Sequence, residues 1–288
     1  MMKKFFLLLL FSIPLFLMAG GPWISGKGKG YFQLSVTSLQ YGELLDGFNN
    51  PNIGLKREVT DLTLQAYLEY GLTERLDLQL VLPFKILRTG DELLDPVNDN
   101  YPEDTVAAGS MHAFSNTFIG AKYLLGTGSY QISAKMLIGA NSASYDSATG
   151  LRSGYDAWML TPSVSIGRGF GNFYFFTEAG YRFKSNSYSN DFLFTAEAGY
   201  RFDWDEKIST WIILVLDGDI KTSLGYYQDN RSLHTGLYVD GEGYVSPGIK
   251  INQKITESLY VNFGIYGALW AEDHGAAPTL NAGLAWDW

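Results

Sequence analysis

Cysteine is absent from this 288-residue chain, and histidine occurs only three times. The absence of cysteine excludes a disulfide scaffold, a thiolate-ligated zinc or iron–sulfur site, and a lipid-anchoring cysteine after a leader. Charged residues are also scarce, at 18%, and 21 lysines and arginines stand against 30 aspartates and glutamates. The net charge of −9 argues against nucleic-acid binding, which depends on basic patches.

Long hydrophobic runs are also lacking beyond the amino terminus. The run from Phe5 to Met18 is shorter than the roughly 18–20 residues that a transmembrane helix needs. Lys3 and Lys4 precede it, and Ala19 offers a small residue for cleavage. This arrangement predicts a cleaved secretory signal over 1–19, followed by one domain over 20–288. An exported chain without membrane-spanning helices is periplasmic, secreted, or a barrel in the outer membrane.

What the chain has in abundance is aromatic residues and glycine. It contains 19 Tyr, 18 Phe, 7 Trp and 32 Gly. Together with the low charge, this composition is typical of membrane β-barrels, which carry aromatic girdles around an apolar outer band.

Apolar and polar residues alternate with the period of two that a strand requires. In one example Leu76, Leu78 and Leu80 alternate with Asp77 and Gln79. Twelve such segments are expected, at 28–42, 58–71, 76–89, 110–125, 129–143, 155–169, 173–185, 191–203, 207–220, 236–251, 257–270 and 277–288. Short and long connections alternate between them, which predicts an all-β fold: a transmembrane, antiparallel, up-and-down barrel with both termini in the periplasm. Twelve strands is the expected number, with ten or fourteen as alternatives.

A soluble β-sandwich would also show alternation. The segments are longer than the usual 5–6 residues of soluble strands, however, and they match the length of a tilted transmembrane strand. Aromatic residues gather at strand ends, as at Phe202 and Trp204. The last segment places Leu284, Trp286 and Trp288 on one face, and closure against the first strand would protect that edge.

Two stretches resemble a bacterial outer-membrane family. Residues 26–34 (GKGKGYFQL) resemble a first barrel strand, and residues 70–78 (YGLTERLDL), followed by Leu82-Pro83-Phe84, resemble a strand–turn–strand signature. These are similar to the transporter-like barrels of the "putative MetA-pathway of phenol degradation" and XagA-like type. The terminal Trp288 resembles the aromatic residue by which the barrel assembly machinery recognises such chains. The resemblance implies an outer-membrane location and the passage of small compounds, with aromatic compounds as one candidate class.

Alternation places many charged side chains and tyrosines on the inward face, because charge facing lipid would cost about 2–4 kcal/mol per Arg or Lys near the midplane. This face is either a polar conduit with aromatic walls or an ion-pair network that fills the lumen, and the sequence leaves both open. The expected lumen-lining residues are Glu69, Lys85, Lys122, Lys135, Glu178, Arg182, Glu197, Arg201, Asp217, Glu242, Tyr244 and Tyr266.

Enzymatic chemistry finds little support, and no cofactor, catalytic residue or metal ligand is expected. Ser232 and His234 are the nearest approach to a nucleophile and its base, but their order and position match no hydrolase pattern. The acidic loop 90–109 lacks the spacing of a dedicated calcium loop, and solvation beside lipopolysaccharide phosphates is the simpler interpretation.

The leading functional hypothesis is a passive pore for small, aromatic or amphipathic solutes in the outer membrane of a diderm bacterium. Its partners would be the lipid bilayer and lipopolysaccharide, the assembly machinery through Trp288, and an unidentified solute, with no nucleic acid. The alternative is a closed structural barrel whose loops 43–57, 90–109 and 221–235 meet partners at the surface. A membrane hydrolase is a distant third hypothesis.

Overall fold

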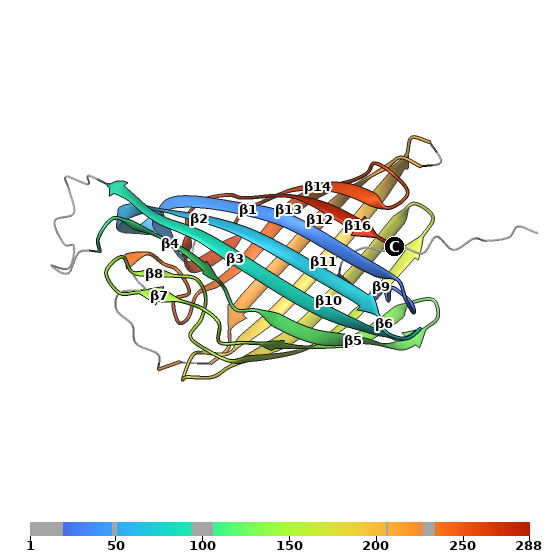
Figure 1. The fold of residues 1–288 in the computed structure, drawn as a ribbon, viewed down its shortest axis with the longest axis horizontal. Coiled ribbons are helices and arrows are strands. Elements are labelled where there is room, and N and C mark those ends of the chain that lie inside the picture. The colour runs from blue at the N-terminus through green and yellow to red at the C-terminus, as the bar shows by residue number, and fades with distance from the viewer. Residues whose placement is uncertain (1–19, 48–50, 94–105, 206, 224, 227–233) are drawn as a thin grey trace, which may run out of the picture.

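A computed structural model describes residues 20–288, except 48–50, 94–105, 206, 224 and 227–233. These residues form a closed barrel of twelve antiparallel strands (Figure 1). Ten of the twelve are single segments: β1 (Gly30–Asp46), β2 (Pro51–Gly71), β3 (Leu76–Glu92), β6 (Gln131–Gly139), β9 (Met159–Phe170), β10 (Phe173–Lys184), β11 (Asp191–Asp203), β12 (Ser209–Lys221), β13 (Gly243–Lys254) and β16 (Thr279–Asp287). Two are interrupted, one as β4 (Gly109–Phe114) and β5 (Phe118–Thr127), the other as β14 (Leu259–Tyr266) and β15 (Trp270–Gly275).

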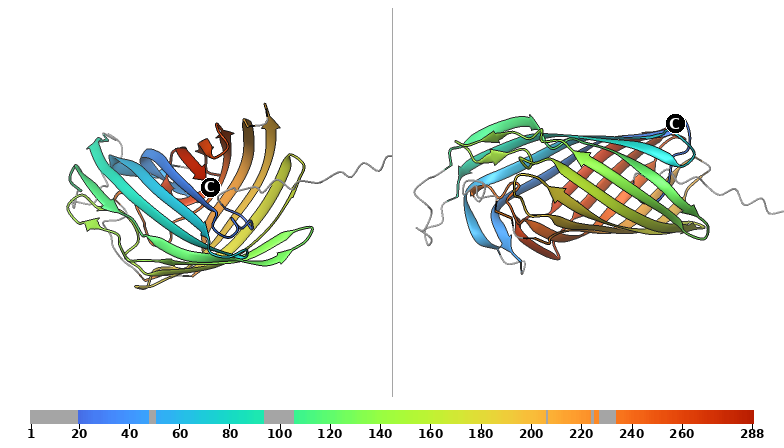
Figure 2. Two further views of the ribbon diagram at one scale, coloured as in Figure 1. Left: turned by 45° about the vertical axis from the view of Figure 1, so that its right-hand side comes forward. Right: turned by 90° about the horizontal axis from the view of Figure 1, so that it is seen from below.

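The barrel closes between its first and last strands. β1 pairs with β16 from Tyr31 opposite Asp287 to Ser38 opposite Leu280. Beyond Thr279, where β16 begins, the far end of β1 pairs directly with β15. Strands on the two sides cross at a large angle when the barrel is viewed from the side (Figure 2), as the tilt of a closed barrel requires.

Side chains alternate along each strand between the inside of the barrel and its outer surface, so the core lies inside the barrel. On β3, Asp77 is fully buried while the next residue, Leu78, is 43% exposed on the outer surface. The same holds on β12, where Ile213 is buried and Leu214 is 59% exposed. The described residues contain no α-helix and therefore no helix that could cross a membrane.

The two ends of the barrel differ. At one end the connections are short, at 72–75, 128–130, 171–172, 204–208 and 255–258. Both chain ends of the barrel lie there, because the backbones of Gly30 and Trp288 donate to each other's carbonyls at 3.1 Å. We call this the short-turn end. The opposite, long-loop end carries the small hairpin β7 (Tyr145–Asp146) and β8 (Leu151–Arg152), seen at the left of Figure 1.

The expected strand count is confirmed, but several boundaries were wrong. Segment 110–125 is broken at Ser115–Thr117, where the Asn116 side chain replaces the ladder: its Nδ2 donates to the carbonyls of Ala140 and Tyr155, at 3.0 and 2.8 Å. Strand 236–251 begins only at Gly243, since 236–242 turn inward as a loop. Segment 257–270 is interrupted after Tyr266, and β15 occupies part of the expected loop 271–276. Loop 43–57 is largely strand, because β1 and β2 continue past the expected ends.

Candidate functional site

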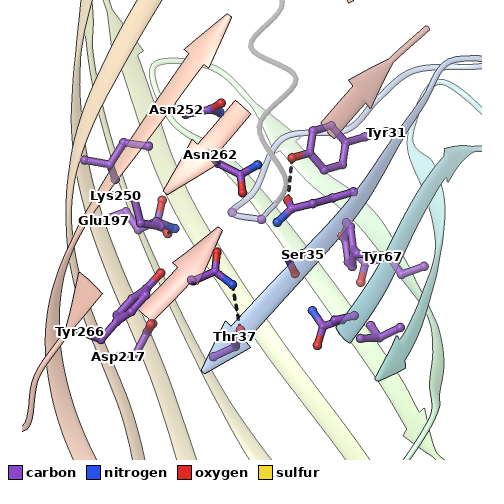
Figure 3. Close-up of a pocket in the computed structure, with 18 of the residues that line it drawn as sticks. Tyr31, Ser35, Thr37, Tyr67, Glu197, Asp217, Lys250, Asn252, Asn262 and Tyr266 are labelled. Carbon is purple, nitrogen blue, oxygen red and sulfur yellow. Dashed lines mark hydrogen bonds and ion pairs between the residues drawn. The ribbon is translucent and has the colours of Figure 1, made fainter. Parts of the chain in front are cut away.

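The barrel encloses a central chamber with a volume of about 710 Å³. Hydroxyl and phenol groups of Tyr31, Ser35, Thr37 and Tyr67 lie on one side of it (Figure 3). Charged groups and a further tyrosine lie on the other. Most of the remaining lining is polar: Gln33, Gln65, Gln79, Lys122, Lys135, Glu197, Asp217, Tyr244, Lys250, Asn252, Asn262, Tyr266 and Asn281.

A second cavity of about 320 Å³ shares Val81, Lys135, Leu137, Asp217 and Tyr244 with the chamber. Its lining is more apolar and includes Phe118 and Leu193 beside charged groups of β10. The two adjoining cavities therefore give the lumen both hydrogen-bonding and apolar surface.

Three lysines line the central chamber, and each contacts a glutamate. Lys122 Nζ lies 2.6 Å from Glu69 Oε1, and Lys135 Nζ lies 2.5 Å from Glu178 Oε1. Lys250 contacts Glu197, which also accepts a hydrogen bond from the hydroxyl of Tyr174. The partners are 43–53 residues apart in sequence, so the barrel wall itself brings each pair together.

Further ion pairs lie toward the long-loop end. Lys85 Nζ is 2.6 Å from Asp61 Oδ2, and Arg182 Nη1 is 2.8 Å from Asp219 Oδ2. His274 Nδ1 lies 2.5 Å from Glu242 Oε1, which ties the end of loop 236–242 to β15.

Of the twelve residues expected to line the lumen, eight border one of the two cavities and four border neither. Lys122, Lys135, Glu197, Asp217, Tyr244 and Tyr266 line the chamber. Glu178 and Arg182 line the smaller cavity. Glu69, Lys85, Arg201 and Glu242 line neither cavity and instead pack within ion pairs. Arg201 Nε is 2.8 Å from Asp203, near the short-turn end, and its guanidinium lies over the ring of Trp211.

Residues 20–25 fold back into the barrel at the short-turn end, and we call this segment the N-terminal plug. The Trp23 ring is 9% exposed and packs edge-on against Tyr174 and Phe176, at 5.5 Å from each. Ser133 Oγ donates to the carbonyl of Pro22, and the backbone of Ser25 donates to Asp77 Oδ2 at 2.8 Å. Sequence reasoning missed this plug; the Pro22-Trp23 pair, two residues beyond the expected cleavage point, was its only signal.

The long-loop end is covered by residues 141–158 and 234–242, which we call the loop cap. Leu151 and Leu237 are buried against strand residues such as Tyr41, whose hydroxyl donates to the carbonyl of Thr235 at 2.7 Å. Tyr155 packs edge-on against both Tyr188 and Tyr238. Burial, with nearby carboxylates adding to it, raises the pKa of Tyr155 well above its usual value, so this hydroxyl stays neutral.

The other expectations concern the loops. Ser232 lies outside the described residues, as does most of the acidic loop 90–109. Among the residues that the structure describes, no three His, Cys, Asp or Glu side chains are grouped to hold a metal ion.

No protein-family model matches the chain, and no curated protein matches it. Solved structures do. The COG4313 outer membrane channel from Pseudomonas putida F1 superposes with a TM-score of 0.63 at 16% identity, over 91% of this chain and 96% of that one. The β domain of the Bordetella autotransporter BrkA superposes with a TM-score of 0.52 at 12% identity, over 90% of this chain and 99% of that one. The translocator domain of the autotransporter NalP from Neisseria meningitidis superposes with a TM-score of 0.50 at 9% identity, over 95% of this chain and 91% of that one.

These likenesses establish the fold. The chain folds as an outer-membrane β-barrel. Because the same fold serves a channel and two autotransporter domains, the function has to be argued from the lumen of this chain.

Proposed function

We propose that the chain is a passive outer-membrane channel for small solutes. The observation that carries this proposal is the polar chamber of about 710 Å³ inside a barrel whose outer surface is apolar. An apolar exterior fits a lipid bilayer, and a hydrogen-bonding interior offers a solute a route that lipid does not. The chemistry requires no cofactor, catalytic group or energy coupling.

The solute class that fits best is small and amphipathic, with an aromatic ring as a natural apolar part. Tyr31, Tyr67, Tyr244 and Tyr266 line the chamber and supply aromatic surface to it. The adjoining cavity sets apolar side chains such as Phe118 next to the Lys135–Glu178 pair. A solute with one polar and one apolar side would find partners for both.

The orientation in the membrane follows from the same proposal. The short-turn end would face the periplasm, and the loop cap would face lipopolysaccharide. Trp288 would be presented to the assembly machinery; its backbone pairs with Gly30, and its ring lies where a side chain at position 30 would have to go.

Swelling of proteoliposomes tests the proposal. Vesicles that contain the refolded mature chain should swell in isosmotic solutions of small aromatic or amphipathic solutes, and more slowly as solute size increases. Vesicles without protein provide the baseline. No swelling with any solute class would overturn the proposal.

A closed structural barrel is the second candidate, and the N-terminal plug and loop cap favour it. Both ends of the lumen are occupied by buried side chains, among them Trp23 and Tyr155. On this alternative the chamber would remain isolated from both sides, and the loops would act on surface partners.

A further inference from the structure

Loop 236–242, between β12 and β13, crosses the mouth of the barrel at the long-loop end. Just before the loop, the carbonyl of Thr235 accepts a hydrogen bond from the Tyr41 hydroxyl of β1 at 2.7 Å. Within the loop, Asp240 Oδ1 accepts from the backbone and the hydroxyl of Ser189, both at 2.7 Å, in the connection between β10 and β11. Because β1 and β10 lie on opposite sides of the closed barrel, the loop reaches from one wall to the other.

Tyr238 lies in the middle of this crossing. Its ring packs edge-on against Tyr155, with 5.2 Å between the centroids, and its hydroxyl is 3.5 Å from Ser115 Oγ. Lys85 Nζ lies 5.4 Å from the centroid of the Tyr238 ring, and the same Nζ is paired with Asp61. The ring therefore contacts the loop cap on one side and a charged pair of the barrel wall on the other.

This contact with the wall is at the border of the central chamber. Lys85 pairs across the strands with Thr63, and Thr63 pairs with Thr37 of β1. Two steps between neighbouring strands separate these positions by about 10 Å. Thr37 lines the chamber, as Figure 3 shows. Tyr238 therefore stands between the chamber and the loop cap.

The backbone of the loop is strained at Tyr238. This residue has φ +55°, in the left-handed region that a bulky side chain seldom adopts. Gly236 and Gly241, at φ +66° and +99°, turn the backbone on either side of it. A strained residue persists only where its surroundings hold it, and such residues are concentrated at switches and ligand clamps. The loop thus has a glycine hinge near each end and a strained residue that the contacts of its ring hold in place.

We propose that the Tyr238 ring is the gate between the central chamber and the long-loop end. The gate opens when the ring leaves Lys85 and loop 236–242 turns about its two glycines. The role of this gate in transport rests on the proposed function, but the access that it controls is a property of the folded chain and is measured without transport.

Thiol labelling of a single cysteine tests the gate, because the chain has no cysteine of its own. Thr37→Cys places the thiol on the chamber wall, and a negatively charged maleimide reports access to it in the refolded chain in detergent micelles. Tyr238→Ala should raise the labelling rate constant about tenfold or more, because a gate that cannot close leaves the open form populated. Tyr238→Phe keeps the ring and should label at a rate close to that of the parent chain.

Further variants separate the gate from general loosening of the cap. Asp240→Ala releases the loop from Ser189 and should also raise the rate. Tyr226→Ala removes a tyrosine that is 83% exposed at the same end of the barrel and should leave the rate unchanged. If Tyr238→Ala fails to fold, Tyr238→Gly takes its place, since glycine suits φ +55°. Circular dichroism verifies the β-structure of each chain.

Labelling of the folded Tyr238 variant at the parent rate would overturn the gate, as would an equal increase with Tyr226→Ala. Swelling of vesicles keeps this result apart from the proposed channel. Faster labelling of the variant without swelling in any solute supports the gate and overturns the channel. Swelling with unchanged labelling supports the channel and overturns the gate.

Discussion

Single residues explain how charged side chains are tolerated inside this barrel. Lys122 and Glu69 are almost completely buried, with 1% and 4% of their side chains exposed, and they contact each other at 2.6 Å. The second carboxylate oxygen of Glu69 accepts hydrogen bonds from Gln79 and from the hydroxyl of Tyr67. The buried Glu69 carboxylate therefore has both a counter-charge and hydrogen-bond partners, which is the condition under which a buried charge is tolerated.

Removing one member of this pair should destabilise the barrel. Lys122→Met leaves Glu69 buried without its cation, and we expect a loss of about 3–5 kcal/mol in the free energy of unfolding. Urea unfolding in lipid vesicles, followed by tryptophan fluorescence, measures it. Lys207→Ala is the control, since the Lys207–Glu257 pair lies exposed on two short turns and should contribute nothing measurable. Equal stability of the two variants would contradict this account.

Neutralising a lumen glutamate should change ion selectivity if the chamber conducts. Glu197→Gln leaves Lys250 without its partner, so the ratio of cation to anion permeability should fall by about twofold or more. Glu178→Gln should act in the same direction through Lys135. Reversal potentials in a salt gradient measure the ratio, with Glu257→Gln on an exposed turn as the control. Unchanged reversal potentials would assign both glutamates to packing alone.

At the level of elements, the N-terminal plug is the feature that most affects access to the chamber. Gly21 has φ +72° and leaves no room for a side chain, which a Cβ would place 2.6 Å from the Trp23 ring. This backbone turn folds the tryptophan into the aromatic pocket of β10 and β12. Truncating the ring should loosen the plug without touching the barrel wall.

The absence of cysteine allows this loosening to be measured directly. A single cysteine at Asn262, on the chamber wall, should react slowly with a charged maleimide in the native chain. Adding Trp23→Ala should increase the labelling rate about tenfold or more, since the largest plug side chain is gone. Trp204→Ala, which removes an exposed ring on a short turn, should leave the rate unchanged. Equal rates in all three chains would mean that the plug does not limit access.

The break between β4 and β5 joins the barrel wall to the loop cap. Asn116 donates to two carbonyls and accepts from the backbone of Tyr155 at 2.7 Å, so it ties the wall to the start of β9. Asn116→Ala should destabilise the barrel by about 1–3 kcal/mol, because buried backbone groups lose their partners. Amide hydrogen exchange should accelerate mainly at 140–158. Asn141→Ala, whose partner Asp156 is exposed, is the matched control, and equal exchange in both would contradict the assignment.

The sequence predicts elements of this kind unevenly. Alternation identifies strands such as β3, because each inward or outward position repeats every second residue. It does not show that Lys122 meets Glu69, since that contact depends on the register of three strands. The plug is unpredictable for a similar reason: Pro22 bonds to Ser133, 111 residues away, and the short segment has no periodicity. The polar run Ser115-Asn116-Thr117 did interrupt the alternation and could have indicated the break before β5.

On the scale of the whole molecule, the barrel combines a channel-like wall with two occupied ends. The wall is apolar outside and polar inside, and the chamber lies between the N-terminal plug and the loop cap. We expect movement of either of these to widen the route through the lumen. The short plug is held by one cluster around Trp23 and by the hydrogen bonds of Pro22 and Ser25, whereas the longer cap is held by several buried leucines and tyrosines. Movement at the short-turn end is therefore the smaller rearrangement.

The central claim is that the chamber is part of a passage across the membrane, and single-channel recording of the refolded mature chain in a planar bilayer tests it most directly. The account predicts small, discrete conductance steps that become larger or longer-lived with Trp23→Ala and stay unchanged with Trp204→Ala. A folded chain that remains electrically silent in all three forms would contradict it, and would leave a structural barrel closed by its ion pairs, plug and cap.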